Sequence, residues 1–135
     1  MANIITNNFK EKLMEGAYNL TTDTVKVALL TSSESPAAED VTFSDTNEVS
    51  GTGYTAGGAT LANLAVTQDD TDDEGVFDAD DVTWSTSTIT ARYAVIYNTT
   101  VSNEIMAYID FTEDKSSSSA DFKIEWNAEG IINLS

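Results

Sequence analysis

Acidic side chains carry the clearest candidate chemistry in this chain. From Asp70 to Asp81, carboxylates and a glycine nearly match the spacing of an EF-hand calcium loop, with Asp70, Asp72 and Glu74 at loop positions one, three and five. Position twelve is Asp81, which reaches less far than the usual glutamate, and strand patterns flank the segment where an EF-hand has helices. Two interpretations stay open: a solvated hairpin turn, or a loose cation site for Ca²⁺ built from Asp70, Asp72, Asp73 and Glu74.

The residue types present exclude most covalent catalysis. The chain contains no histidine and no cysteine, so it lacks the usual proton shuttle, a Ser-His-Asp triad and a thiolate nucleophile. Its carboxylates are abundant, but they gather at one turn without nearby aromatic side chains that would raise a pKa. We therefore predict that the protein is not an enzyme and has no catalytic residues.

Three other side chains could recognise a ligand. Trp84 and Trp126 could form a sugar-binding platform, but each lies at the end of an alternating strand pattern, which favours core packing. Arg92 is the only arginine and lies inside the strongest strand pattern. We expect it to pair with a carboxylate.

The charge of the chain is strongly one-sided. The formal net charge is −17, and between Lys26 and Arg92 there are 13 acidic residues and no basic one. Such a chain repels nucleic acid and anionic lipid. The acidic surface is either a solvated face or a complement to a basic partner. The sequence also shows no signal-peptide pattern and no apolar run of membrane-spanning length, so neither membrane nor nucleic acid is an expected partner.

The N-terminal residues 1–19 predict a short amphipathic helix. A stripe at four-residue spacing defines its apolar face: Ile5, Phe9, Leu13 and Ala17. Asn3 or Thr6 could cap its start. The stripe must be buried, either on the protein's own sheet or on a neighbouring subunit. Phe9 and Leu13 are therefore candidate partner contacts.

Residues 20–135 have the pattern of a β body. Strands are expected at residues 24–31, 59–67, 75–84, 88–97, 104–111, 120–126 and 131–134. No helix-length pattern separates them. This favours a single mainly β domain over residues 1–135: an antiparallel β-sandwich or small barrel, of jelly-roll or immunoglobulin-like size, with one short N-terminal helix. The strand at 88–97 should be central because both of its faces become apolar.

Two polar segments connect these strands. Residues 32–50 form a long loop that Val41 and Phe43 should fasten down, and the glycine-rich residues 50–58 predict turns rather than a ligand loop. Tyr54, within the 32–58 loop region, is a third candidate partner contact. Residues 112–119 are expected to form an exposed loop.

Five stretches, in order, resemble a family of small tailed-bacteriophage virion structural proteins. They are DTVKVALLTS at 23–32, NEVSGTGYTAGG at 47–58, FDADDVTW at 77–84, ARYAVIY at 91–97 and YIDF at 108–111. The resemblance implies a protein without catalytic residues, either a capsid decoration (cement) protein or a head–tail accessory protein.

The leading hypothesis is therefore a virion protein that decorates the capsid by binding the major capsid protein. We expect it to be made in the host cytoplasm without a signal peptide and to act as a homo-oligomer in the phage particle. A tail, neck or fibre-associated virion protein is the first alternative. A calcium-dependent carbohydrate-binding module, with an exposed Trp84 or Trp126, is the second.

Overall fold

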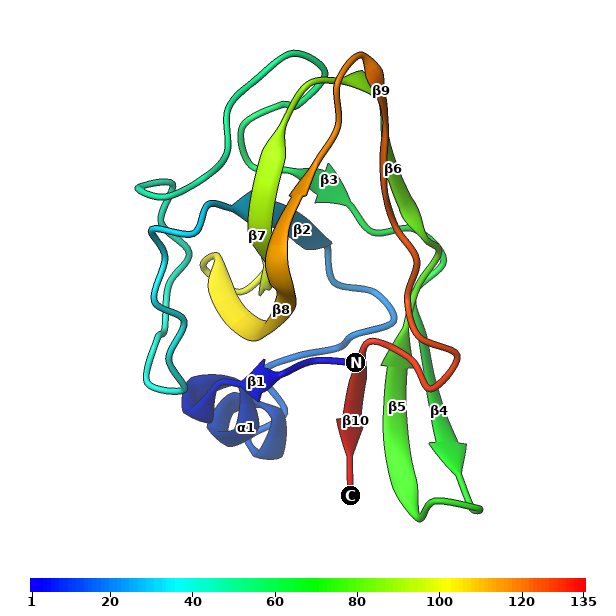
Figure 1. The fold of residues 1–135 in the computed structure, drawn as a ribbon. Helices are drawn as coiled ribbons and strands as arrows, with labels where there is room; N and C mark the ends of the chain where they lie inside the picture. Colours follow the sequence, from blue (N-terminus) through cyan, green and yellow to red (C-terminus); the bar gives the residue numbers. More distant parts are fainter.

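Strand β7 (Thr90–Asn98) lies at the centre of a five-stranded antiparallel sheet in the computed structural model, which describes residues 1–135 (Figure 1). The sheet order is β1-β8-β7-β2-β3. The other strands are β1 (Ile4–Ile5), β8 (Glu104–Ser116), β2 (Val25–Leu30) and β3 (Ala59–Thr60). The prediction that residues 88–97 form a central strand is confirmed.

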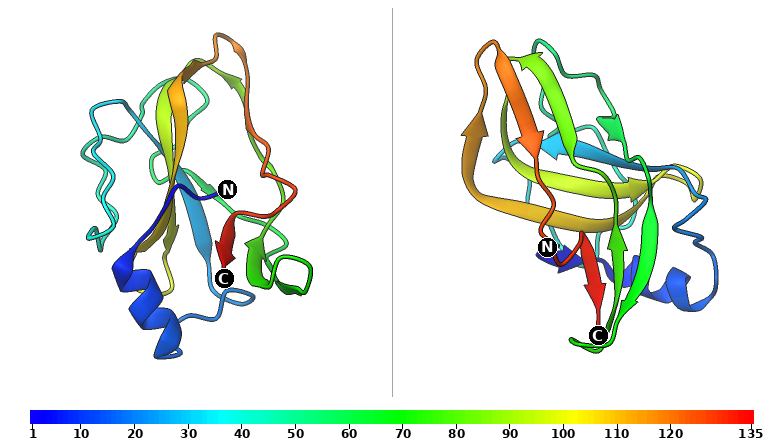
Figure 2. Two further views of the ribbon diagram at one scale, coloured as in Figure 1. Left: turned by 60° about the horizontal axis from the view of Figure 1, so that its bottom comes forward. Right: turned by 90° about the vertical axis from the view of Figure 1, so that its right-hand side faces the viewer.

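A second layer consists of two small antiparallel sheets. One has the order β10-β5-β4 and the other pairs β6 with β9. Their bounds are β4 (Ala65–Asp69), β5 (Glu74–Asp78), β6 (Val82–Ser87), β9 (Ala120–Ile124) and β10 (Ile132–Leu134). In Figure 2 the strands of this layer cross those of the five-stranded sheet steeply. With 44% strand and 6% helix, the fold is mainly β and sandwich-like, as the sequence predicted.

The five-stranded sheet is covered on both faces. A cluster of 23 buried residues fills the space between the layers, and a cluster of six, including Ala28, Val95 and Tyr97, lies on the other face of the sheet. The long loop after β2 covers this second face. Phe43 stacks on Tyr97 with ring centroids 4.3 Å apart, and the Ile105 amide donates to the Val41 carbonyl. Both expected fastening points therefore hold the loop, Val41 through its backbone.

The helix is shorter than predicted. Helix α1 spans Asn7–Met14, and Ile5 belongs to strand β1. The chain is extended before Thr6 because its backbone pairs with β8. The Thr6 hydroxyl then caps the helix by accepting from the Phe9 amide at 3.3 Å, and it donates to the Ile105 carbonyl at 2.7 Å. The prediction of a helical stripe starting at Ile5 was wrong, while Thr6 as the cap is confirmed.

Two predicted strands are each divided in two. Residues 59–67 divide at Asn63, which has φ of 54°, and the halves β3 and β4 enter different sheets. Residues 75–84 divide between β5 and β6. There the Trp126 indole donates to the Asp80 carbonyl at 2.7 Å, and the Trp126 amide donates to Asp81 at 2.9 Å. The prediction of one continuous strand over residues 75–84 was wrong.

Strand β8 is longer than predicted and contains two irregularities. It continues to Ser116, so the exposed 112–119 loop is reduced to residues 117–119, and Thr112 takes φ of 70° at a register shift. A second shift leaves Met106 without a partner, because Ala107 pairs with Ile96 and Ile105 pairs with Tyr97. An extra residue reverses the alternation of side chains. Ile105 and Ala107 therefore lie on opposite faces of the sheet, whereas unbroken alternation would place them on the same face.

Position 58 requires glycine for two reasons. Its backbone has a φ of 81°, and it lies very close to the backbone of β2. A Cβ atom at this position would clash with the Val27 carbonyl and lie 2.7 Å from the Ala28 Cα. Gly16 has a similar φ of 77° but open space around it. The two glycines therefore differ in crowding and share the same backbone conformation.

Replacing each glycine by alanine separates these effects. Gly16→Ala should lower the free energy of unfolding by about 1 kcal/mol, the cost of a left-handed conformation. Gly58→Ala should lower it by about 3 kcal/mol or more, because β2 must shift. Urea denaturation of both variants measures the difference. Equal losses would contradict the close approach of residue 58 to β2.

Candidate functional site

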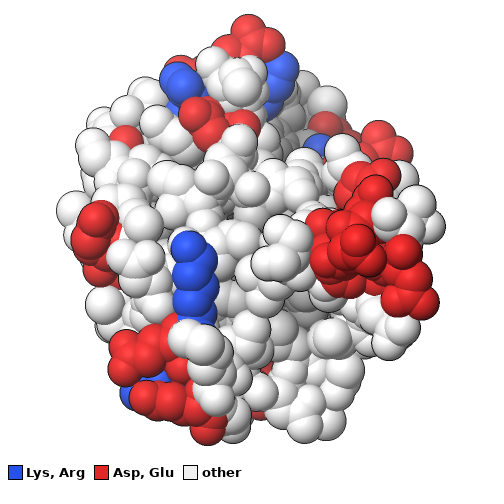
Figure 3. Space-filling view, turned by 90° about the horizontal axis from the view of Figure 1, so that it is seen from below, with Lys and Arg blue, Asp and Glu red and all other residues white.

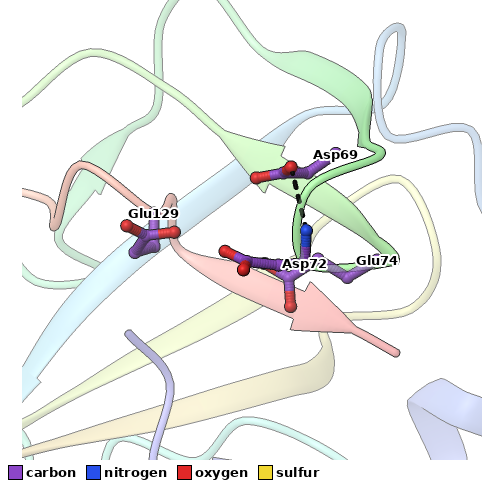
Figure 4. Close-up of side chains that lie close together, drawn as sticks. All are labelled: Asp69, Asp72, Glu74 and Glu129. Carbon is purple, nitrogen blue, oxygen red and sulfur yellow. Dashed lines mark hydrogen bonds between the residues drawn. The ribbon is translucent and has the colours of Figure 1, made fainter.

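Four carboxylates converge where the β4–β5 hairpin meets the turn before β10. Asp69, Asp72, Glu74 and Glu129 each offer an oxygen atom, and these atoms all lie within 4.8 Å of one another (Figure 4). Asp69 and Glu74 are half-buried, and Asp72 and Glu129 are exposed. We refer to these four residues as the acidic cluster.

Strand pairing and local hydrogen bonds position the cluster. Asp69 pairs with Glu74 at the end of the hairpin, and Asp69 Oδ1 accepts from the amides of Thr71 at 2.8 Å and Asp72 at 3.2 Å. Pairing of β10 with β5 brings the 127–130 turn alongside. Asn133 Nδ2 then donates to Glu74 Oε1 and to the Glu129 carbonyl, both at 2.6 Å.

The structure changes the membership of the predicted cation site. Asp72 and Glu74 belong to the cluster, but Asp70 and Asp73 do not, and Asp70 accepts instead from Gln68 at 2.9 Å. The hairpin flanked by strands is confirmed over an EF-hand arrangement. Glu129 was missed because only the β5–β10 register brings it close, and the sequence around it has no metal-binding spacing.

The cluster is electrostatically unbalanced. None of the ion pairs in the structure involves its four residues. Figure 3 shows acidic side chains gathered densely on one side of the molecule, at its hairpin end. Like charges at this separation repel one another. Ca²⁺ binds six to eight oxygen atoms, so four carboxylates with water could hold it.

Tyr54, a predicted partner contact, points inward. Its hydroxyl donates to Glu48 at 2.6 Å and accepts from the Leu29 amide at 3.0 Å. Glu48 also accepts from the Gly57 amide at 2.8 Å, and the Tyr97 hydroxyl donates to the Gly57 carbonyl at 2.6 Å. These bonds fasten the glycine-rich segment to β2 and β7. The hydroxyl of Tyr54 is therefore used within the fold, and its role as a partner contact stays a prediction.

Burial and neighbouring carboxylates make four of the five tyrosines weak acids. Burial raises the pKa of Tyr97 to about 12, with a smaller contribution from the charge of Glu48. Burial and then a hydrogen bond to a carboxylate raise the pKa values of the other three further; the pairs are Tyr18–Glu104, Tyr54–Glu48 and Tyr108–Asp40.

The tryptophans and the arginine serve the fold. Trp84 and Trp126 are only 6% and 9% exposed, so core packing is confirmed and the sugar-platform interpretation was wrong. Arg92 pairs with Asp110, with Nε to Oδ1 at 2.8 Å, as expected. This hydrogen bond lowers the pKa of Asp110.

Of the two helical contacts, only Leu13 reaches a surface groove. Phe9 is completely buried and stacks on Tyr18, so its prediction as a partner contact was wrong and the helix packs on its own sheet. Leu13, Leu20 and Val66 line a groove of about 400 Å³ between the end of α1 and β4. Met14, the residue after Leu13, is 84% exposed. We name this the α1–β4 groove.

The comparisons with known proteins give no relative. No protein-family model matches the chain, and no match was found among curated proteins or solved structures.

Helix α1 has eight residues, and no helix in this structure has the length and apolar character of a membrane span.

Calcium should stabilise the protein through the acidic cluster. We expect millimolar Ca²⁺ to raise the melting temperature by a few degrees, because a bound cation relieves the repulsion among Asp69, Asp72, Glu74 and Glu129. Asp72→Asn should weaken this response, whereas the matched variant Asp70→Asn, which removes the same charge outside the cluster, should keep it. Differential scanning calorimetry provides the measurement. An unchanged melting temperature in the wild type would show that the cluster is a solvated turn.

The tyrosines should make the protein unstable in alkali. Their pKa values are raised on folding, so the stabilisation is complete below pH 10, the ordinary tyrosine value, and is lost as the pH rises toward 12 and above. Tyrosinate absorbance and far-ultraviolet circular dichroism, followed together against pH, should therefore change in one transition. Ionisation of most tyrosines before any loss of strand signal would contradict the buried hydrogen bonds.

Proposed function

We propose that this chain is a non-enzymatic structural protein of a tailed-bacteriophage particle, and that it decorates the capsid by binding the major capsid protein. Two features support the proposal: the ordered resemblance of five sequence stretches to virion proteins, and a surface with an apolar groove beside a dense acidic patch. The α1–β4 groove is the observation that carries the docking role.

Four of the five stretches that resemble virion proteins form one structural unit, and the fifth, residues 77–84, lies in the second layer, in and between β5 and β6. Residues 23–32, 91–97 and 108–111 lie in or next to β2, β7 and β8, which are neighbours in the sheet. Residues 47–58 are bonded onto this unit through Tyr54 and Tyr97. The resemblance therefore falls on residues that hold the fold together, which supports a shared architecture.

The groove has the character of a protein contact. Val66, which lines the groove, and Met14, which lies next to the lining residue Leu13 in the chain, are 52% and 84% exposed. They are two of the three large apolar side chains exposed in the whole chain. Burial of such side chains supplies most of the affinity at a small interface. The acidic hairpin begins on the same strand as Val66, so the matching partner surface presents an apolar side chain next to basic groups. A second copy of this chain, with the same charge of −17, fits poorly there.

The remaining charge suits a particle surface. Strong negative charge keeps the protein soluble and away from the packaged nucleic acid. Many copies on a repeating shell, or homo-oligomers at its symmetry axes, gain avidity that one small groove lacks.

Copy number in purified particles separates capsid decoration from the tail, neck or fibre alternative, because a shell repeats a site far more often than a ring or fibre does.

Polar replacement at the groove and beside it should weaken capsid binding. The double variant Met14→Ser/Val66→Thr should bind at least about tenfold more weakly to capsids of the parent phage assembled without this protein, because two apolar side chains that the complex would bury are lost. Val41→Thr is the matched control, since Val41 is 46% exposed but lines a different pocket, with Phe43 and Tyr108. Co-sedimentation measures both. Wild-type occupancy by the double variant would remove the groove from the mechanism, and failure of the wild type to bind would reject capsid decoration itself.

A further inference from the structure

A second groove lies between β8 and β9, on a side of the sandwich that the capsid-binding proposal does not use. It has a volume of about 320 Å³, and its lining includes Phe111 and Lys115 of β8 and Phe122 and Ile124 of β9. Phe111 and Phe122 meet across it with ring centroids 6.3 Å apart. We name it the β8–β9 groove.

Both walls of this groove are strand edges that lack a partner. Strand β9 pairs only with β6, and β8 pairs along its length with β7. On its other side β8 pairs only with β1, through Tyr108 and Ala107. Residues 112–116 of β8 are all exposed. An unpaired edge presents backbone N–H and C=O groups that accept an added strand.

The chain itself shows how a strand fits between these walls. The Asn3 amide donates to the Tyr108 carbonyl at 2.9 Å, and the Ala2 amide donates to the Ile131 carbonyl at 2.9 Å. Residues before Ile4 therefore leave β8 at Asn3 and cross to the second layer. Asn3 Oδ1 accepts from the Asp110 amide at 2.7 Å, and Met1 lies at the groove. An antiparallel strand continuing the line of β1 would run beyond these contacts along residues 111–116, where no strand of this chain pairs with the outer edge of β8 (Figure 1).

We propose that the β8–β9 groove is a strand-addition site for an extended segment of a neighbouring polypeptide. The segment runs antiparallel to β8 in the line of β1, and apolar side chains at alternate positions face Phe111 and Phe122. Main-chain hydrogen bonds to β8 supply affinity, and the apolar lining of the groove favours a segment whose apolar side chains alternate along the strand.

The charges at the rim specify a segment without strong net charge. Lys115 lies 2.6 Å from Glu113, and Lys123 lies 3.5 Å from Glu125 and 3.7 Å from Asp81. The charged residues that line the groove itself are Lys115, Lys123, Asp121 and Glu125, two of each sign, so its lining is balanced, unlike the rest of this acidic chain. Lysines and a bulge on an edge also discourage indiscriminate pairing, and Thr112 provides the irregularity here.

A synthetic peptide tests the site on the intact protein. The probe is a capped hexapeptide of alternating threonine and valine, and its control is the same peptide with N-methyl groups at alternate residues, which cannot pair at that edge. Amide hydrogen exchange and ¹⁵N chemical shifts are followed by NMR. We expect the unmethylated peptide to slow exchange in residues 112–116 by about tenfold or more, and the methylated peptide to have no effect.

Two variants localise the effect. Phe111→Ser should weaken binding of the unmethylated peptide by about tenfold, whereas Val66→Thr, in the other groove, should leave it unchanged. The comparison of the two peptides uses wild-type protein and remains decisive if Phe111→Ser does not fold.

Several results would overturn the proposal: no binding up to the solubility of the peptide, equal binding of both peptides, or shifts that map away from β8 and β9. Protection of residues 112–116 without peptide, together with dimers in sedimentation, would assign the groove to a second copy of this chain and reject a different partner. Capsid binding is measured separately, so either proposal can fail while the other stands.

Discussion

Burial of β2, β7 and β8 on both faces is the constraint on which the rest of the structure depends. One face packs against the β4–β6, β9 and β10 layer, and the other is covered by the long loop after β2. A sheet buried on both sides needs each covering segment held in place, because its exposure would leave apolar side chains in water. The stacking of Phe43 on Tyr97 and the approach of Gly58 to β2 meet that need. The surfaces available for partners are therefore confined to the margins: the end of α1, the hairpin and the open edge of β8.

A chain with 23 acidic and 6 basic residues must satisfy most of its carboxylates without cations. This protein uses neutral donors. Three tyrosine hydroxyls donate to carboxylates, in the pairs Tyr18–Glu104, Tyr54–Glu48 and Tyr108–Asp40. The side-chain amide of Asn133 donates to Glu74, and the backbone amide of Trp126 donates to Asp81. Hydrogen bonds to carboxylates are stronger than those between neutral groups. These bonds connect loops to the sheet, so several of the acidic residues are structural rather than part of a solvated face.

The sequence was informative where alternation was unbroken and misleading where one residue interrupted it. The patterns at β2, β7 and β9 predicted strands correctly, because their apolar residues face the core without interruption. Asn63 and the Trp126 contacts with Asp80 and Asp81 divided two predicted strands, and no local pattern signals such long-range bonds. The extra residue Met106 moved Ile105 to the other face. The candidate cation site was half recovered, since Asp72 and Glu74 are local to the turn while Glu129 arrives only through the β5–β10 register.

Pairing of β10 with β5 also has a kinetic consequence. Ile131 and Ile132 are almost completely buried in the main core, and they are reached only after nearly all of the other strands have been synthesised. Contacts between distant parts of a chain slow folding, because loops must close before they form. A ribosome must therefore release residues through Leu134 before the second layer can close. Until then the nascent chain exposes the apolar inner faces of both layers, and this is the stage at which it depends most on chaperones.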